Sequence, residues 1–245
     1  EPLERFRAPE TLLSPRTKLV WFETPINPTL RCVDMAKVSA ACREGGVLAI
    51  VEHKDASEAQ RRITSPDGHA ATEIRGHYEG AEDPVYVGGK WIEISYGRPI
   101  KRGRDLWGSG PTYGRFLNHG APVWRAGADI STYLMSDLPL VINGATVPAG
   151  GHTLFIELKN DKTWTLIVSD WQPQQRYNPG DKTKLWGSFG YTKDKDVARA
   201  PMTVTKTPYV TEELLWEFLD MSDKGGTIAL RWDNVMATVP FTVKD

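Results

Sequence analysis

The sequence has few cysteines, no excess of either charge and no long apolar run, and each of these absences excludes a class of protein. Its two cysteines, Cys32 and Cys42, fall in one segment with helical periodicity. Their separation on a helix would be about 15 Å, which is too far for a disulfide. We interpret both as small buried side chains. The chain also lacks the Cys and His spacings that are typical of metal sites, so the sequence predicts no metal.

The charge balance and the hydropathy exclude two kinds of partner. A net charge of −1 at pH 7 gives no overall attraction to nucleic acid or to an anionic membrane. No apolar run approaches the roughly 20 residues that a membrane-spanning helix needs. We therefore expect no nucleic-acid partner and no membrane span. The 245 residues suffice for one large domain or two small ones.

Residues 1–55 have the pattern of a small βαβ unit. An apolar strand begins at Lys18, and Pro28 marks the start of a helix over residues 30–43. Gly45 and Gly46 end that helix, and a second apolar strand follows over residues 47–51. Two strands joined in this way are expected to be parallel. One such unit cannot bury both of its faces, so it must pack against another surface.

The segment SPRTKLVWFETPINPTLRCVDMAKVSAACREGGVLAIV closely resembles part of the pyridoxal-phosphate enzymes of Cys/Met metabolism, the cystathionine γ-lyase and γ-synthase group. The resemblance covers roughly residues 10–51, and the run ETPINPT is its most specific part. It implies that Asn27 contacts the cofactor and that Glu52 replaces the aspartate that pairs with the pyridine nitrogen. The family also needs a Schiff-base lysine in a serine-rich segment, which the sequence lacks, although Lys54 lies nearby. We therefore predict no cofactor, with a degenerate pyridoxal-phosphate lyase as an alternative.

Residues 56–68 are polar and charged and are predicted to be a linker. From residue 69 to residue 245 the hydrophobic periodicity is two, and turn signals such as Asn143-Gly144 recur about every ten residues. This pattern predicts a mainly β fold, an antiparallel β-sandwich of the jelly-roll or immunoglobulin-like kind, after the N-terminal βαβ appendage. The expected strands are residues 71–78, 91–96, 130–135, 138–142, 151–158, 164–169, 185–191, 198–206, 213–221, 227–232 and 237–243.

Several separated motifs in this part resemble the bacterial family DUF2911, whose function is not established. They are SYGRPIKRGRDLWG, VWRAGAD, VPAGGHTLF, LWGSFGY, DVARAPMTV and LRWDN, in that order, and the resemblance covers about residues 65–245. It implies a β-sandwich protein exported to the periplasm or the outside of the cell, with a cytoplasmic location as the alternative. The chain departs from the pattern in the connections FLNHGAPV and WQPQQRYNPGDKTK.

A cluster of cations lies in the stretch from Trp91 to Asp129. Its members are Arg98, Lys101, Arg102, Arg104 and Arg125, with Asp129 at its end. Converging guanidinium groups would suit a carboxylate, sulfate or phosphate. In the other interpretation, which we favour, the cations pair with nearby carboxylates and fasten loops to the sandwich.

The aromatic residues and the histidines also allow a structural and a functional interpretation. Most of the nine tryptophans fall in or next to expected strands and are predicted to be core anchors: Trp91, Trp107, Trp124, Trp164, Trp186, Trp216 and Trp232. Trp171 and Tyr177 lie instead in a loop rich in Gln, Pro and Asn, which is typical of a sugar-stacking surface. His119 and His152 are isolated in the sequence, and we predict structural roles for both.

We therefore predict a non-catalytic binding or interaction module that associates with itself and takes a small anionic or glycan ligand. Self-association is expected from the exposed strand edges of the N-terminal unit. The alternatives are an enzyme, either the lyase relic or a hydrolase with a carboxylate near Arg98, Arg125 and Asp129, and a carbohydrate-binding module that uses Trp171 and Tyr177.

Overall fold

The computed structural model describes residues 19–23, 48–52, 65–174 and 177–244. The chain divides into two compact units, residues 1–63 and residues 64–245, and each is described by itself. The first unit contains a parallel strand pair, β1 (Leu19–Glu23) and β2 (Leu48–Glu52), in which Leu19 is opposite Leu48. The predicted parallel pairing is confirmed. The predicted helix over residues 30–43 lies outside the described residues, as does most of the predicted linker.

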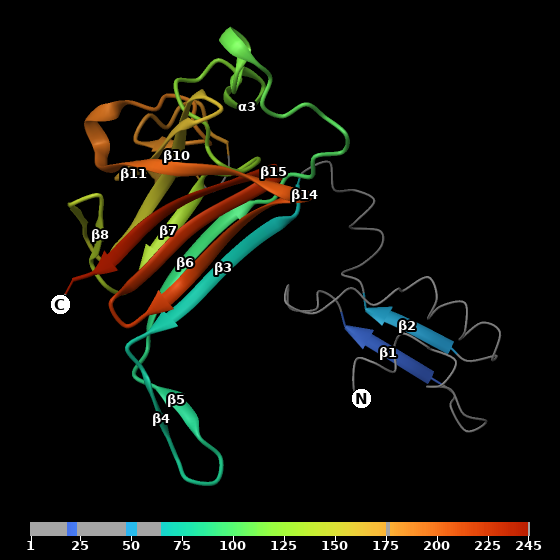
Figure 1. Cartoon of the computed structure of the whole chain (residues 1–245), viewed down its shortest axis with the longest axis vertical. Coiled ribbons are helices and arrows are strands. Elements are labelled where there is room, and N and C mark those ends of the chain that lie inside the picture. Colours follow the sequence, from blue (N-terminus) through green and yellow to red (C-terminus); the bar gives the residue numbers. More distant parts are fainter. Residues whose placement is uncertain (1–18, 24–47, 53–64, 175–176, 245) are drawn as a thin grey trace. The chain divides into compact units, whose positions relative to one another are not determined.

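The second unit is built on a nine-stranded sheet whose paired strands run antiparallel (Figure 1). The mainly β prediction is confirmed. In sheet order the strands are β3 (Asp67–Ile74), β6 (Lys90–Gly97), β7 (Thr132–Ser136), β10 (Gly150–Asn160), β11 (Thr163–Ser169), β14 (Asp196–Ser222), β15 (Gly225–Val243), β8 (Leu140–Ile142) and β9 (Ala145–Val147).

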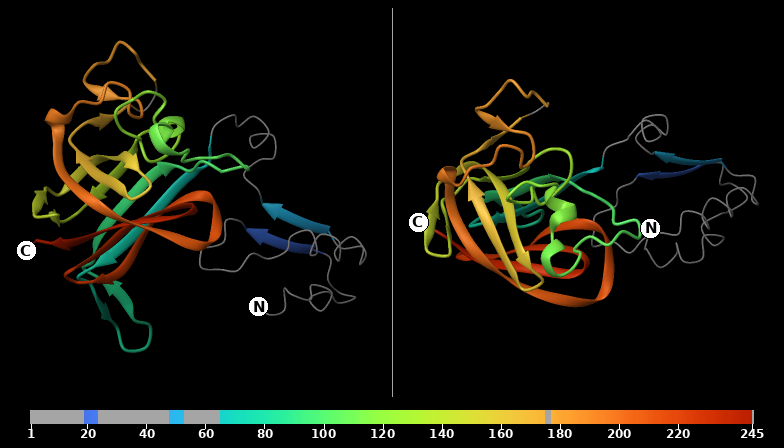
Figure 2. Two further views of the ribbon diagram at one scale, coloured as in Figure 1. Left: turned by 45° about the horizontal axis from the view of Figure 1, so that its top comes forward. Right: turned by 90° about the horizontal axis from the view of Figure 1, so that it is seen from above.

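One long strand folds this sheet into two layers. β14 has 27 residues, and its first part pairs with β11, where Met202 is opposite Trp164. Its later part pairs with β15 and lies across β6, so that the Trp216 amide donates a hydrogen bond of 3.1 Å to the Tyr96 hydroxyl. Figure 2 shows the orange ribbon of β14 sweeping from one layer into the other.

The core fills the space between the two layers. On β6 the alternating residues Ile92 and Ile94 are fully buried, and Ile228 and Leu230 are fully buried on β15. This alternation follows from the pleat, which turns every second side chain toward the opposite layer. A smaller cluster around Phe155 covers the outer face of β10 and β11.

Two pairs of predicted strands are in fact single long strands. Residues 198–206 and 213–221 both belong to β14, and residues 227–232 and 237–243 both belong to β15. The breaker signals between them coincide with register shifts between Lys206 and Thr211 and between Thr211 and Leu215. Asp233, opposite Thr211, has φ 54°. A β-bulge of this kind bends a strand without ending it.

The expected strand over residues 185–191 is wrong. Only Lys184–Leu185 forms a strand there, β13, which runs parallel to β12 (Gln172–Pro173). Gly187 and Gly190 have φ of 61° and 84°, a left-handed conformation that breaks an extended chain.

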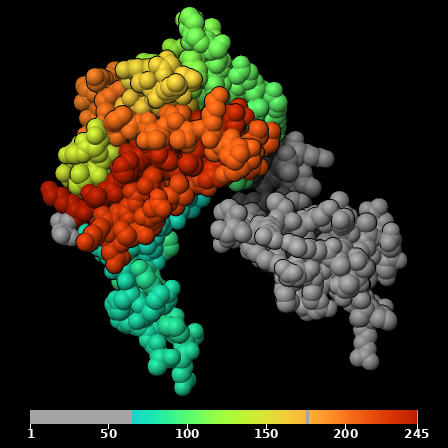
Figure 3. Space-filling model, viewed as in Figure 1, coloured from blue at the N-terminus to red at the C-terminus, as the bar shows by residue number. Residues whose placement is uncertain are grey.

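The sequence patterns missed a hairpin and several short turns. β4 (His77–Glu79) and β5 (Val85–Val87) form a hairpin that projects from the body of the second unit, as the teal arm in Figure 3. The short helices are η3 (Gly110–Thr112), α3 (Arg115–Asn118) and η4 (Lys193–Lys195).

Candidate functional site

Two of the clustered cations are bound to the layer formed by β14 and β15. A guanidinium nitrogen of Arg98 lies 3.2 Å from a carboxylate oxygen of Glu213, and Lys101 Nζ lies 3.5 Å from Asp233 Oδ1. The backbone amide of the next residue, Arg102, donates to Glu212 Oε2 at 3.1 Å. These contacts fasten the loop after β6 to β14 and β15.

The Arg104 side chain forms hydrogen bonds within its own loop. Its guanidinium donates to the carbonyl oxygens of Lys101, at 2.9 Å, and of Ile100, and it stacks 5.5 Å from the ring centre of Phe116. Its donors are therefore turned toward backbone and an aromatic ring.

Arg125 and Asp129 lie together in a partly buried turn. Arg125 Nη1 donates to the backbone carbonyl of Asp129 at 2.5 Å, and Asp129 Oδ2 accepts the Ser65 amide at 2.8 Å. Burial lowers the pKa of the Arg125 guanidinium from its ordinary value, and the Asp129 carboxylate opposes this shift. The turn joins the start of the second unit to the segment before β7. The side chains of Arg98, Lys101, Arg104 and Arg125 thus have separate partners.

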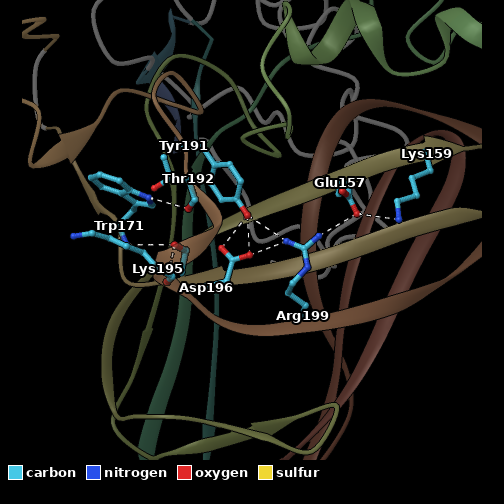
Figure 4. Close-up of polar contacts among 9 residues, drawn as sticks. Glu157, Lys159, Trp171, Tyr191, Thr192, Lys195, Asp196 and Arg199 are labelled. Carbon is cyan, nitrogen blue, oxygen red and sulfur yellow. Dashed lines mark hydrogen bonds and ion pairs between the residues drawn. The ribbon is translucent and has the colours of Figure 1, made fainter.

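The two residues of the proposed sugar-stacking surface differ in exposure. Trp171 is only 8% exposed, donates from Nε1 to the Thr192 carbonyl at 3.2 Å, and has the Lys195 ammonium 4.4 Å above its ring (Figure 4). The premise that Trp171 is exposed is wrong. Tyr177 is 64% exposed and packs edge-on against Trp186.

The same part of the molecule holds a polar network that the sequence did not predict (Figure 4). Arg199 lies 2.7 Å from an Asp196 carboxylate oxygen and 3.0 Å from Glu157 Oε2. The Tyr191 hydroxyl lies 2.7 and 2.9 Å from the two oxygens of Asp196. Burial, followed by the Asp196 carboxylate, raises the pKa of Tyr191. Because each group has a partner, we assign this network to holding the loop before β14 against the sheet.

The two histidines of the sequence analysis differ in their surroundings. His152 is buried, and its two ring nitrogens lie 3.0 Å from Asp170 Oδ1 and 3.0 Å from the Pro148 carbonyl. His119 is exposed at the end of α3 with φ 49°. Within the described part of the chain, no group of three or more His, Cys, Asp or Glu side chains is placed to hold a metal ion.

A cavity of about 640 Å³ lies elsewhere in the second unit, and sequence reasoning did not predict it. We call it the Trp107 cavity. Its wall comes from four segments: the loop that carries Trp107 and Tyr113, the turn between β10 and β11, β14 near Thr205, and β15 near Asn234. The last two flank the irregular part of the β14–β15 pairing, where the register shifts after Lys206. The bulge thus interrupts the ladder beside the cavity wall.

The apolar part of the wall belongs to a cluster of tryptophans. The rings of Trp107 and Trp164 lie 4.9 Å apart, and those of Trp124 and Trp232 stack at 6.0 Å with an angle of 13°. The indole nitrogen of Trp164 donates to the Tyr113 hydroxyl at 3.0 Å, and that of Trp232 donates to a carbonyl at 3.0 Å. Trp107 is 8% exposed, yet its Nε1 is buried with no hydrogen-bond partner among the described residues. The prediction of Trp107 as a core anchor is correct for its ring and incomplete for its N–H.

Charged and amide side chains complete the wall. Asp105, Asp161, Lys162 and Lys206 line the cavity, and none of them forms an ion pair with another described residue. Gly108, whose φ of 65° is left-handed, turns the chain after Trp107, so that Leu106 and Trp107 are buried while Ser109 is exposed. The motifs RDLWG, DVARAPMTV and LRWDN each contribute residues to this wall.

The raised pKa of Tyr113 makes the free energy of unfolding depend on pH in the alkaline range. Burial raises its pKa to about 12 from the ordinary value of 10.0, against the effect of the Trp164 hydrogen bond. A raised pKa gives a contribution that is full below pH 10 and is lost as the pH rises toward about 12. We expect the free energy of unfolding to fall above about pH 10, by at most about 1.4 kcal/mol per pH unit for this group. Urea unfolding of wild type and Tyr113→Phe at several pH values measures it, and equal slopes would contradict the assignment.

The fold and this wall define a mainly β module with an aromatic and polar cavity. The model of a protein family of unknown function, DUF2911, matches residues 81–241, and the chain belongs to that family. The model of the Cys/Met metabolism PLP-dependent enzymes matches residues 3–60. No solved structure matches.

A curated relative matches the N-terminal part. It is a probable cystathionine gamma-synthase from Herpetosiphon aurantiacus, 32% identical over 77 residues, which are 31% of this chain. The chain spans only 24% of the length of that relative. Of the residues that the resemblance assigns to the cofactor, Asn27 lies outside the described residues, as does Lys54, and Glu52 is the last residue of β2. No described contact therefore supports a pyridoxal-phosphate site, and we derive no reaction from it. No helix in the described part of the chain is long and apolar enough to cross a membrane.

Proposed function

We propose that the chain is a non-catalytic binding module that takes a small ligand in the Trp107 cavity. The observation that carries this proposal is the cavity of about 640 Å³, whose wall brings the Trp107 and Tyr113 side chains together with amide and charged side chains from β14, β15 and the turn between β10 and β11.

The volume and the lining support the same proposal. Pockets for small ligands usually measure roughly 300–1,000 Å³ and combine aromatic walls with a few polar groups. Trp107, Tyr113 and Val235 supply the apolar part here, and Asn160 and Asn234 supply amides.

The chemistry of the wall favours binding over catalysis. Burial raises the pKa of Tyr113, which lines the cavity, to about 12, away from neutral pH. A general base works best with a pKa near the working pH, so Tyr113 stays protonated and acts as a donor. Self-association and export remain predictions from the sequence.

A library of small polar compounds tests the proposal by ligand-observed NMR on the full chain. We expect at least one compound to bind, and to bind about fivefold more weakly to Tyr113→Phe, which keeps a ring in the wall and removes its hydroxyl donor, a loss of about 1 kcal/mol. Tyr177→Phe is the matched control, because Tyr177 is 64% exposed and does not line the cavity.

A second variant separates the cavity from the rest of the surface. Ser109 lines the cavity and is exposed, so Ser109→Trp should block the cavity with little effect on folding, and Ser109→Ala should not. The proposal fails if no compound binds, or if every binding compound binds Ser109→Trp as well as wild type.

A further inference from the structure

The hairpin of β4 and β5, which we call the β4–β5 arm, stands away from the core of the second unit (Figure 3). Within the described residues its two strands pair only with each other, so both outer edges of the arm are unpaired. At its root the Gly76 amide donates to the Tyr86 hydroxyl at 2.9 Å. The Arg75 amide donates to Asp223 Oδ1 at 2.9 Å, which fixes the root to the turn between β14 and β15. An isolated two-stranded hairpin is marginally stable in water, so a further partner would stabilise the arm.

The arm exposes apolar and acidic side chains together. Tyr78 is 71% exposed and Val85 is 59% exposed. Glu79 is exposed at the end of β4, and Glu82 and Asp83 are exposed in the connection to β5. Within the described residues, none of these three carboxylates forms an ion pair with Lys or Arg. The arm therefore presents carboxylates and apolar surface that a partner could bind.

A cationic surface lies at the opposite end of the second unit, around α3 (Figure 1). We call it the α3 surface, and its residues are Arg102, Arg104, Arg115 and Phe116. The Phe116 ring is 44% exposed, and the Arg104 guanidinium lies 5.5 Å from its centre. Arg102 and Arg115 are exposed, and neither side chain forms an ion pair or a hydrogen bond with another described residue.

Two carboxylates border the α3 surface without pairing with its arginines. Asp105 Oδ1 accepts the Gly108 amide at 3.1 Å, and Glu212 Oε2 accepts the Arg102 amide at 3.1 Å. Neither forms an ion pair with a guanidinium group among the described residues. The guanidinium groups of Arg102 and Arg115 thus remain available to carboxylates of a partner, which they can bind in bidentate geometry.

We propose that the β4–β5 arm of one copy of this chain docks on the α3 surface of a second copy. Charge complementarity supports this occupant, because the arm offers carboxylates without cationic partners and the α3 surface offers guanidinium groups without anionic ones. The arm and the α3 surface of one copy lie at opposite ends of the unit, so they cannot bind each other (Figure 1). Contacts between unlike surfaces join copies head to tail, into rings or open chains.

This inference goes beyond the proposed function and is tested apart from it. Neither the arm nor the residues of the α3 surface line the Trp107 cavity. Ligand binding in the cavity and association through the arm are therefore separate measurements, and either can fail without the other.

Sedimentation velocity on the full chain, from about 5 to about 500 µM, measures the association. We expect a dissociation constant of about 10–100 µM, since a contact made by one short hairpin falls at the low end of interface sizes, below roughly 1,200 Å² in total. Species larger than a dimer should grow with concentration. Raising the salt from about 50 mM to about 500 mM should weaken the association about tenfold, because salt screens exposed charge pairs.

Charge reversal on each surface identifies the two partners. An arm variant with Glu82→Lys and Asp83→Lys has cations on both surfaces, and an α3 variant with Arg102→Glu and Arg115→Glu has carboxylates on both. Each variant alone should associate at least tenfold more weakly than wild type, because like charges then meet. An equimolar mixture of the two should regain association, since each arm then finds a surface of opposite charge. Circular dichroism checks that both variants keep the fold.

Matched controls reverse single charges elsewhere on the surface. Lys193→Glu and Asp194→Lys lie in η4, are exposed and belong to neither surface, so both should associate as wild type does. The proposal is overturned if wild type stays monomeric over the whole concentration range, or if either double variant alone associates as wild type does. Loss of association in both variants without recovery in the mixture also overturns it, because the two surfaces then do not bind each other.

Discussion

Replacing Trp124 by alanine is expected to lower the free energy of unfolding by about 3–5 kcal/mol, the range for removing a large aromatic side chain from a core. Trp124 is 1% exposed and stacks on Trp232, and the Trp107 ring contacts both of them edge-on. Its backbone also bridges to Ile156 on β10. The substitution therefore leaves a void where the loop before β7 joins the sheet. Urea unfolding followed by far-ultraviolet circular dichroism measures the loss.

The matched control is the same substitution at an exposed tryptophan. The prediction that Trp91 is a core anchor is wrong, because Trp91 is 46% exposed on β6. Trp91→Ala should therefore change the free energy of unfolding by no more than about 0.5–1 kcal/mol. Equal losses at the two positions would show that the tryptophan cluster does not anchor the fold.

Replacing Arg199 by alanine is expected to cost about 2–4 kcal/mol. The Asp196 side chain is 5% exposed, and Arg199 is its cationic partner at 2.7 Å. Removal of one member of a buried pair leaves the other charge unpaired, which costs about 3–5 kcal/mol. We place the expectation lower because the Arg199 side chain is 26% exposed and solvent screens part of the interaction. Urea unfolding of the variant measures it.

Two further variants assign the loss to the pair. Lys159 lies 3.5 Å from Glu157 in the same network but is 60% exposed, so Lys159→Ala should cost less than about 1 kcal/mol. A double-mutant cycle of Arg199→Ala with Asp196→Asn should give a coupling of about 1–3 kcal/mol. A coupling near zero would mean that Arg199 acts through packing alone.

The strand pattern was predictable because burial between two layers imposes a period of two. Ile92 and Ile94 alternate with exposed or half-buried neighbours on β6, and the sequence shows this directly. The continuity of β14 was not predictable in the same way. Thr207-Pro208 reads as a break, but a bulge keeps the strand running through it, and pairing partners far along the chain decide that outcome.

The site was less predictable than the fold. Cations that are close in the sequence drew attention to the segment after β6, yet Arg98 and Lys101 face different carboxylates. The Trp107 cavity joins segments more than a hundred residues apart, from Trp107 to Val235. Hydrophobic periodicity places the indole ring in the core, but it carries no information on whether the indole N–H has an acceptor.

The long strand β14 has a consequence for cooperativity. Because one continuous strand supplies hydrogen-bond partners to β11 in one layer and to β15 in the other, neither layer retains a complete ladder when the other opens. The two layers therefore share one unfolding transition, in contrast to sandwiches whose sheets are joined only by loops. A destabilising substitution in either layer, such as those at Trp124 and Arg199, is therefore expected to lower the free energy of unfolding of the whole second unit.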